Sequence, residues 1–372
     1  MRARDLGIVI GSLAPGTNDA ITDVAGVRVG HATIIKGDGP LVVGEGPVRT
    51  GVTLVMPHDG DPWRDAVYAG SHTLNGNGEL TGLEWVRESG MLTSPIALTN
   101  THSVGVVRDA IIAAEIRDRD ASSGVHWALP VVGETYDGQL NDINGLHVRP
   151  EDLFDALADA RSGPVAEGNV GGGTGMICHE FKGGIGTASR VLGDAEGGFT
   201  VGVLVQANHG RRERLSIDGV PVGREIPTTD VPSAWDGPRT AGSGSIIGIV
   251  ATDAPLLPHQ CQRLAQRAAL GVGRVGGAGE NSSGDMFLAF ATGNGPMPAE
   301  DSAEGQPFSN DVRTLLDGHI TPLFWAVIEA TEEAIVNALL AAETMVGRDG
   351  HTAHALPVDR LSGIMERYRP AT

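Results

Sequence analysis

Short apolar runs, many of them rich in β-branched residues, recur along the chain and usually end at Gly, Asn, Asp or Pro. Runs of this length and composition are typical of β-strands. They predict strands over Val52–Met56, Pro95–Leu98, Phe199–Val205, Ile246–Ala251 and Met286–Ala291. The apolar run Leu6–Ala14 predicts a first strand near the start of the sequence.

Longer stretches with apolar residues at helical spacing lie between these runs. They predict helices over Val107–Arg117, Pro150–Arg161, Leu256–Leu270 and Pro322–Val346, and Gly271 is expected to cap the third of them. Strands and helices come in blocks rather than in strict alternation. This order favours a layered α+β architecture.

Glycine is unusually frequent, at 54 of 372 residues, which is roughly twice its usual share. Because no Gly-X-Y period is present and 41% of the residues are hydrophobic, the sequence predicts an ordered globular protein with many tight turns. The formal net charge of −19 disfavours nucleic acid and anionic lipid as partners. No apolar run approaches the ~20 residues of a membrane span. We therefore expect a cytoplasmic protein that acts on small molecules.

A glycine motif of the dinucleotide-binding type occurs at Gly271, Gly273 and Gly276. In nucleotide-binding proteins this motif follows a strand and opens a helix. Here it follows a predicted helix, so the end of that helix and a turn explain it better than a bound nucleotide.

The cysteines and histidines show no spacing that is typical of a metal site. Cys178 and Cys261 are expected to be small buried apolar residues. No HExxH motif is present, and several histidines lack a partner ligand close in sequence: His102, His179, His209 and His259. We therefore expect no metal site.

Residues 226–244 contain three prolines without periodicity, which indicates an exposed loop or linker, and they lead directly into the strand predicted from Ile246. The junction between the two is Gly244-Ser245. A serine Oγ can attack the preceding carbonyl, and Gly244 offers no side chain to obstruct it. Hydrolysis of the resulting ester would leave Ser245 with an α-amine of pKa about 7.7–8, which can act as a base for its own hydroxyl.

Two other segments carry polar groups suited to this chemistry. The strand predicted over Phe199–Val205 leads to Asn208, whose amide suits an oxyanion-hole donor. Ser283 and Asp285 lie two residues apart, so in an extended chain both project to one face. A hydroxyl and a carboxylate placed there would orient a nucleophile and relay protons.

At these positions the sequence resembles the self-cleaving aminopeptidases of the L-aminopeptidase/D-esterase and β-peptidyl aminopeptidase family. The motifs follow one another in order along nearly the whole chain, and this order makes the set specific. They cover residues 23–31, 100–105, 134–138, 171–176, 199–208, 244–259 and 283–285.

The resemblance implies a four-layer αββα sandwich like that of N-terminal-nucleophile hydrolases, with a different connectivity. It implies a single domain over residues 1–372 that is cut between Gly244 and Ser245. The products would be an α chain of residues 1–244 and a β chain of residues 245–372. Family members usually assemble as tetramers of such pairs.

The resemblance also assigns roles to individual residues. Ser245 corresponds to the nucleophile and, through its new amine, to the base. Ser283 and Asp285 correspond to the supporting hydroxyl and acid, although some members carry Glu in place of Asp285. Asn208 corresponds to the oxyanion donor.

Two further residues are implied on the substrate side. Tyr136 corresponds to a tyrosine that lines the site, and Glu134 would hold the ammonium group of the substrate. The implied substrates are small peptides, amino-acid amides or esters with a free N-terminal amine. Amides of L-residues, D-alanyl esters and β-amino-acid peptides all remain open.

Two alternatives accompany this interpretation. An ornithine-acetyltransferase-like enzyme would also cut itself and would transfer an acyl group to an amine, but such enzymes use Thr where this chain has Ser245. A non-catalytic binding protein on the same scaffold would use Gly244-Ser245 as an ordinary turn.

Overall fold

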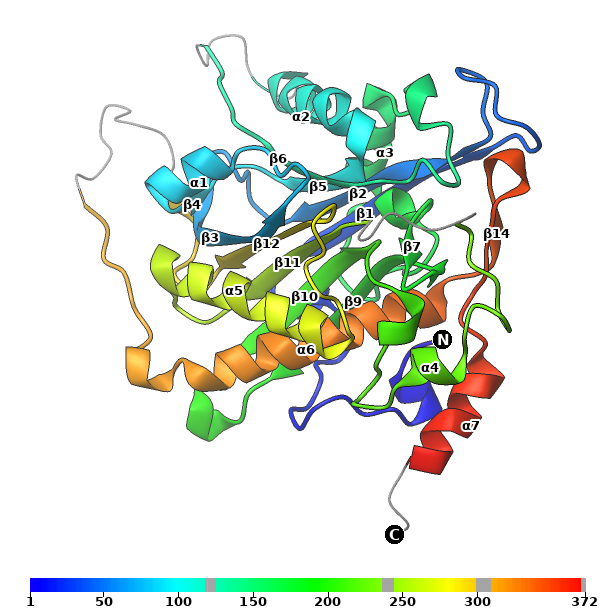
Figure 1. Ribbon diagram of the computed structural model, residues 1–372. Coiled ribbons are helices and arrows are strands. Elements are labelled where there is room, and N and C mark those ends of the chain that lie inside the picture. The colour runs from blue at the N-terminus through cyan, green and yellow to red at the C-terminus, as the bar shows by residue number, and fades with distance from the viewer. Residues whose placement is uncertain (118, 120–124, 236–243, 299–308, 369–372) are drawn as a thin grey trace.

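Two β-sheets packed face to face form the centre of the molecule in a computed structural model (Figure 1). The structure describes residues 1–117, 119, 125–235, 244–298 and 309–368. The smaller sheet has the order β1 (Arg28–Lys36), β2 (Val48–Met56), β5 (Ile96–Asn100) and β6 (Val131–Thr135). The larger sheet has the order β13 (Met297–Pro298), β3 (Asp65–Gly76), β12 (Gly284–Ala291), β11 (Ile246–Thr252), β10 (Thr200–Ala207) and β9 (Gly184–Val191).

Short strands complete the β-structure of the described residues. Strand β4 (Met91–Leu92) pairs with β3, β7 (Ile177–Cys178) pairs with β8 (Phe181–Lys182), and β14 (Met345–Val346) pairs with β15 (Thr352–Ala353). The α-helices are α1 (Leu83–Ser89), α2 (Val104–Arg117), α3 (Pro150–Asp159), α4 (Val222–Glu225), α5 (Pro258–Arg274), α6 (Thr321–Ala341) and α7 (Val358–Tyr368).

Helices cover the outer faces of both sheets. Figure 1 shows α2 and α3 over the smaller sheet, and α5 and α6 over the larger one. One apolar cluster fills each of the three layer boundaries: between α2–α3 and the smaller sheet, between the two sheets, and between the larger sheet and α5–α6. The expected four-layer αββα sandwich of the α+β class is confirmed.

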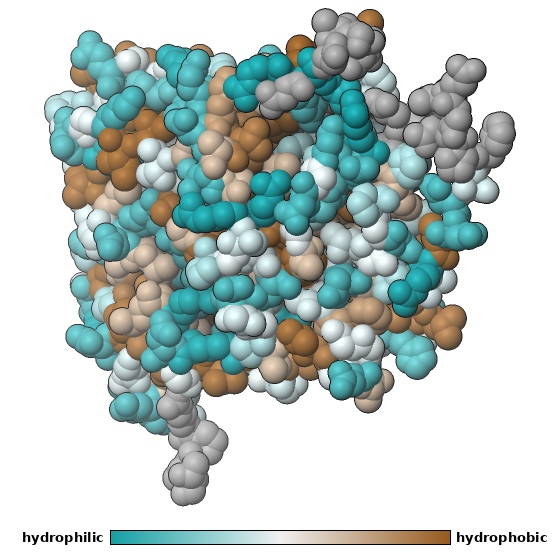
Figure 2. All heavy atoms as spheres, turned by 180° about the vertical axis from the view of Figure 1, so that it is seen from behind, coloured by the Kyte–Doolittle hydropathy of each residue, from teal (hydrophilic) through white to brown (hydrophobic). Residues whose placement is uncertain are grey.

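Hydrophilic and hydrophobic residues are interspersed over the face of the molecule seen in Figure 2. Across the described ranges, no helix combines the length and the apolarity that crossing a bilayer requires.

Each of the five strands predicted in the body of the chain coincides with a strand of the structure to within a few residues. The strand predicted over Leu6–Ala14 is wrong. Residues Arg4–Leu6 form a 3-10 turn, and Ala14 makes an isolated bridge to Val191. The Glu329 side chain on α6, rather than a neighbouring strand, accepts two backbone N–H groups of this segment: Ser12 donates to Oε1 at 3.0 Å, and Leu13 donates to Oε2 at 3.1 Å. Just before the segment, Ala3 donates to Asn337 Oδ1 at 2.9 Å.

All four predicted helices are present, but two of them end elsewhere. Helix α6 stops at Ala341, because Ala342 turns to extended backbone and leads into β14. Helix α5 runs through Gly271 to Arg274, so Gly271 is not the predicted cap. A Cβ at Gly271 would lie 2.6 Å from the Thr331 side chain, so this glycine allows α5 and α6 to approach closely.

The glycine motif of the dinucleotide type therefore lies in and after the last turn of α5. Carbonyl groups, rather than the N–H groups that bind phosphate, are exposed at that end of a helix. Within the segment 226–244, residues 226–235 and 244 are described and lack long regular elements, and residues 236–243 lie outside the described ranges.

The buried guanidinium of Arg190 on β9 joins three parts of the chain. Its Nε lies 3.1 Å from Glu329 Oε2, and its Nη2 lies 2.6 Å from Glu333 Oε2, both on α6. Nη2 also donates to the carbonyl oxygen of Ile10 at 2.7 Å. Two carboxylates one helical turn apart thus share one cation, and the N-terminal segment packs on them.

Replacing this cation is expected to destabilise the protein. Arg190→Ala would leave Glu329 buried without its cation and Glu333 with Arg4 alone, which costs about 3–5 kcal/mol. The measurement is the free energy of unfolding in urea. The matched control, Arg360→Ala, removes an exposed pair with Asp230 and should cost far less, because water solvates both charges. Equal losses for the two variants would contradict the role given to Arg190.

Candidate active site

Four strand ends of the larger sheet meet at one edge and bring the candidate residues together. Ser245 directly precedes β11, and β11 runs parallel to β12 with Ile246 opposite Asp285. Strand β10 is antiparallel to β11 and ends at Ala207 opposite Ile246, so Asn208 follows at the same edge. Strand β3 also ends here, with Gly76 opposite Gly284, so residues 208 positions apart in sequence become neighbours.

Ser245 is buried and is held at two atoms. Its Oγ accepts a hydrogen bond from the backbone N–H of Gly284 at 2.9 Å. Its carbonyl oxygen accepts one from the backbone N–H of Asn208 at 3.0 Å. The side chain and the backbone of Ser245 are therefore both fixed by the neighbouring strands.

Ser283 and Asp285 form a buried pair beside this serine. Ser283 Oγ donates to Asp285 Oδ1 at 2.6 Å, so the two side chains share one face, as their spacing predicted. Burial raises the pKa of Asp285 to about 6, and the hydrogen bonds from Ser283 and from the N–H of Ile246 oppose the rise. This carboxylate therefore changes its charge within the range in which many enzymes work.

The side chain of Asn208 is fixed at both ends of its amide. Its Oδ1 accepts from the backbone N–H of Ile177 at 2.7 Å, and its Nδ2 donates to the carbonyl oxygen of Tyr136 at 2.9 Å. A primary amide carries two hydrogens on Nδ2, and the second is the one that an oxyanion would use. Ile177 is held in turn by the β7–β8 hairpin, where the buried Lys182 Nζ donates to the carbonyl oxygens of Gly173, Met176 and Gly183.

Glu134 lies near the end of β6, in the other sheet, and is buried. Its Oε1 accepts from the backbone N–H of Glu79 at 3.0 Å, and its Oε2 accepts from Thr101 Oγ1. Burial raises the pKa of Glu134, and these two hydrogen bonds oppose the rise. A Cβ added at Gly78 would lie 2.9 Å from Glu134 Oε1 and 3.2 Å from Gly284 Cα. Glu134 is therefore close to Gly284, whose N–H donates to Ser245 Oγ.

Tyr136 follows β6 and has a different environment. Its carbonyl oxygen accepts from Asn208, and 41% of the residue is exposed. A pocket of about 440 Å³ is lined by residues 78–85 with Thr73, Arg87, Leu129 and Met286. None of the six candidate residues lines it, but Glu79, which does, donates its N–H to Glu134. The structure thus places all six candidate residues around one strand edge, with Glu134 and Tyr136 contributed by the second sheet.

Three hydrogen-bond donors of the candidate site were not singled out from the sequence: the N–H of Gly284, the N–H of Glu79 and the hydroxyl of Thr101. Backbone donors leave no side-chain signal, so Gly284 and Glu79 were not recognisable. Thr101 lies within the motif at residues 100–105, but nothing in that motif points to Glu134.

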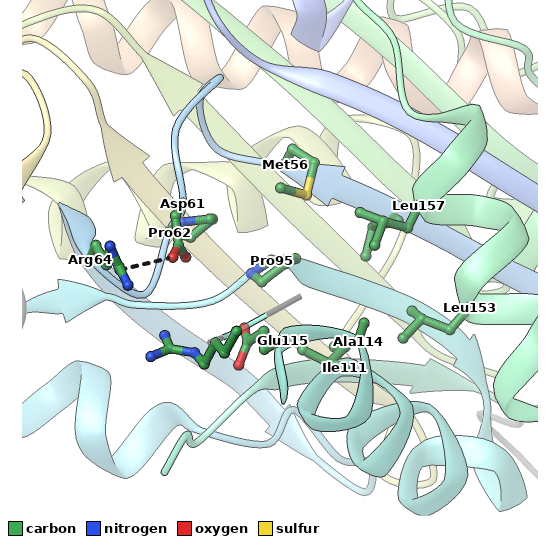
Figure 3. Close-up of a pocket in the computed structure, with 12 residues that line it drawn as sticks. Met56, Asp61, Pro62, Arg64, Pro95, Ile111, Ala114, Glu115, Leu153 and Leu157 are labelled. Carbon is green, nitrogen blue, oxygen red and sulfur yellow. Dashed lines mark ion pairs between the residues drawn. The ribbon is translucent and has the colours of Figure 1, made fainter. Parts of the chain in front are cut away.

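A second pocket, of about 470 Å³, lies between the smaller sheet and α2–α3 (Figure 3). Figure 3 shows apolar side chains from β2, α2 and α3 around it, with the Asp61–Arg64 ion pair at 3.6 Å on one side. It is lined by Leu54, Met56, Asp61, Pro62, Arg64, Pro95, Ile111, Ala114, Glu115, Arg119, Leu153 and Leu157. None of the six candidate residues lines this cavity.

Residues 19–353 match the model of peptidase family S58. The chain belongs to peptidase family S58. This membership supports aminopeptidase activity, the hydrolysis of a peptide at its N-terminal residue, and favours a hydrolase over a non-catalytic binding protein.

Relatives of this S58 chain match it along nearly its whole length. The β-peptidyl aminopeptidase BapA of Sphingosinicella microcystinivorans is 51% identical over 99% of this chain and 92% of its own. A β-aminopeptidase of Burkholderia sp. is 54% identical, with a TM-score of 0.91 over the whole of both chains.

A third relative bears on the fold. The L-aminopeptidase D-Ala-esterase/amidase of Ochrobactrum anthropi is 44% identical, with a TM-score of 0.88 over 99% of this chain and 98% of its own. It is described as a prototype for the serine aminopeptidases and as a new variant of the N-terminal-nucleophile hydrolase fold. The S58 chain shares that fold.

The backbone of Gly284 is expected to tolerate no side chain. In Gly284→Ala, the new Cβ would lie 2.6 Å from the carbonyl oxygen of Asn77 and 2.8 Å from Gly78 Cα. Either β3 or the N–H that reaches Ser245 must shift, which should lower kcat/KM for an aminoacyl p-nitroanilide about 10- to 100-fold. The control, Gly105→Ala on α2, places its Cβ in open space and should leave the activity unchanged. Full activity of Gly284→Ala would contradict the importance of this hydrogen bond.

Proposed function

We propose that the chain is a serine aminopeptidase that cuts itself between Gly244 and Ser245 and then uses Ser245 as an N-terminal nucleophile. The observation that carries the proposal is the position of Ser245. It begins a central strand, its Oγ is held by Gly284, and the Ser283–Asp285 pair lies beside it.

The backbone of Gly244 supports self-cleavage at this bond. Its φ is +123°, a conformation that residues with side chains rarely adopt. A Cβ at this position would overlap the carbonyl oxygen of Asn208. The residue on the acyl side of the bond is therefore restricted to glycine, and the packing leaves its carbonyl carbon without a side chain on the approach to Ser245.

The proposed cleavage has two steps. Ser245 Oγ attacks the carbonyl carbon of Gly244, the C–N bond breaks, and the proton of the hydroxyl is passed to the departing nitrogen. Water then hydrolyses the ester, which gives a carboxylate on Gly244 and a free α-amine on Ser245. The products are the chains 1–244 and 245–372.

In the mature enzyme, the α-amine of Ser245 takes the proton from Oγ as this oxygen attacks the carbonyl carbon of the substrate. Asn208 Nδ2 stabilises the oxyanion, and Ser283 with Asp285 holds the hydrogen-bond network around the nucleophile. The proton passes to the leaving amine, and water releases the N-terminal amino acid from the acyl-enzyme. Each step uses protein groups and water, so the proposed mechanism requires neither a metal nor an organic cofactor.

The substrate end of the site supports recognition of a free amine. Glu134 is a buried carboxylate close to Gly284, and a substrate ammonium group would compensate its charge. Tyr136, which is 41% exposed, would line the approach. The pocket lined by Gly78 and Glu79 would receive the rest of the substrate, because the Glu79 N–H donates to Glu134. The two relatives described as β-aminopeptidases share about half of this sequence, so we propose that peptides with an N-terminal β-amino acid are the preferred substrates.

Assembly into a homo-oligomer of α/β pairs is part of the same proposal. Leu270 on α5 and Trp325 on α6 are more than half exposed and line one surface pocket on the outer helix layer. Large apolar side chains gathered in this way are typical of surfaces that pack against another subunit.

Self-cleavage predicts two fragments of about 25 kDa and about 13 kDa, the 244- and 128-residue shares of 38.5 kDa. Ser245→Ala should remain a single chain and should lose p-nitroanilide hydrolysis, because it has no nucleophile. Ser245→Thr keeps the hydroxyl and should still be cut, more slowly because of the added methyl group. Intact-mass measurement and a denaturing gel follow both variants.

The proposal fails if the wild-type chain stays at 38.5 kDa after long incubation, or if Ser245→Ala still hydrolyses the substrate. Fragments cut at another bond would contradict the assignment of Gly244-Ser245 while leaving the peptidase family untouched. A panel of aminoacyl p-nitroanilides then ranks the three substrate classes.

The rate of self-cleavage is expected to depend on pH through Asp285. Below its pKa of about 6 the carboxyl group gains a proton and no longer accepts well from Ser283, so cleavage should slow about tenfold for each pH unit below that value. The uncut chain has no α-amine on Ser245, so that group does not interfere. Newly synthesised chain from a cell-free reaction, moved to buffers on both sides of the pKa, gives the profile.

Asp285→Asn serves as the matched variant, because its amide does not titrate. It should cut slowly and at a rate that does not change with pH across the same range. A wild-type rate that is flat through pH 6 would contradict the role of this carboxylate.

A further inference from the structure

A cysteine and two histidines gather next to the two segments that hold Asn208. Cys178 ends β7, His179 follows it in the turn to β8, and His209 follows Asn208. All three residues are buried, and one ligand atom from each lies within 4.8 Å of the others. None of them has a role in the reaction proposed above.

The distances are close to those of a metal site. Cys178 Sγ lies 3.8 Å from His209 Nδ1, and the rings of His179 and His209 meet edge to face with their centroids 5.1 Å apart. Zn–S bonds of about 2.3 Å and Zn–N bonds of about 2.0–2.1 Å place neighbouring ligand atoms roughly 3.3–3.6 Å apart. Rotations of the imidazole rings that move the nitrogen atoms by about 1 Å would therefore bring all three ligand atoms within bonding distance of one cation.

The hydrogen bond on the far side of His179 favours the ligating tautomer. Its Nδ1 lies 3.0 Å from the carbonyl oxygen of Arg211. A carbonyl oxygen only accepts, so Nδ1 carries the hydrogen and Nε2 carries the lone pair. Histidines that bind metals commonly donate their other N–H to a backbone carbonyl in this way.

The turn that contains His179 has a strained backbone and is held by hydrogen bonds from Arg212. His179 and Glu180 have φ values of +48° and +63°, in a two-residue turn where Asn-Gly is the usual sequence. Arg212 donates to the carbonyl oxygens of both residues, at 3.1 and 2.8 Å. A side chain at Gly210 would overlap the His179 imidazole, so this glycine makes room for the ring. Strain of this kind persists where the surroundings enforce it, and it clusters at functional sites.

We propose that Cys178, His179 and His209 bind a thiophilic divalent cation of the Zn²⁺ class. One thiolate and two neutral imidazoles form a donor set that suits Zn²⁺, with water in the fourth position. Binding forms one Zn–S and two Zn–N bonds, and the thiol proton of Cys178 leaves to solvent.

The cation would join the two backbone segments that hold the oxyanion amide. Ile177, which precedes Cys178, donates to Asn208 Oδ1, and His209 follows Asn208 directly. Bound Zn²⁺ would thus fix the position of Asn208 through its neighbours in the chain and would take no part in the chemistry at Ser245. The site is independent of whether Ser245 is the nucleophile.

The test uses the full chain after removal of metal by a chelator and dialysis. Titration with Zn²⁺ against a chromophoric chelator should give about one ion for each chain. Co²⁺ in place of Zn²⁺ should give a thiolate-to-cobalt charge-transfer band, which reports the Cys178–metal bond directly. Cys178→Ser should remove the band, and His179→Gln should weaken Zn²⁺ binding at least tenfold.

Cys261→Ser is the matched control, because Cys261 is the other free, buried cysteine and lies on α5, where its Sγ donates to the carbonyl oxygen of Tyr68. It should keep the charge-transfer band. Absence of the band in the wild-type chain would overturn the proposal even if no variant folds. Loss of the band in Cys261→Ser with retention in Cys178→Ser would overturn it as well.

Discussion

The parallel pairing of β11 with β12 is the constraint on which the site depends. Parallel strands begin at the same edge, so the register that sets Ile246 opposite Asp285 also sets Ser245 beside Ser283 and Gly284. A slip of one residue would turn every side chain of β12 to the other face of the sheet. The apolar residues of both strands, buried against the second sheet on one face and against α5–α6 on the other, hold that register.

The second sheet is part of the site as well as a cover for it. Gln206 on β10 donates from Nε2 to the carbonyl oxygen of Thr99 and to Thr135 Oγ1, both at 2.8 Å, so a buried polar bridge joins the two sheets. Thr135 stands between Glu134 and Tyr136, which reach the candidate site from that side. The spacing between the sheets therefore sets the distance between the carboxylate of Glu134 and the hydroxyl of Ser245.

The local pattern of apolar residues was enough to predict the strands and helices of the core, because those segments keep the spacing of a strand or a helix. It was not enough where distant side chains decide the structure. Leu6–Ala14 is apolar, yet Glu329 accepts the N–H groups of Ser12 and Leu13 and no strand forms. Gly271 indicated the end of a helix, but it lies within α5, where it allows close packing against α6. His209 lies 31 residues from Cys178, so the cysteine–histidine cluster had no sequence signal.

The contacts between the N-terminal segment, β9 and α6 have a kinetic consequence for the proposed cleavage. Residues 1–244 supply Arg190 and the backbone of Ala3 and Ser12, while residues 245–372 supply Glu329, Glu333 and Asn337. A cut at Gly244 would leave these contacts in place, but folding would change from a unimolecular to a bimolecular reaction. Once unfolded in dilute solution, the two fragments would have to find each other again, so the mature protein would owe its persistence to slow unfolding rather than to reversible refolding.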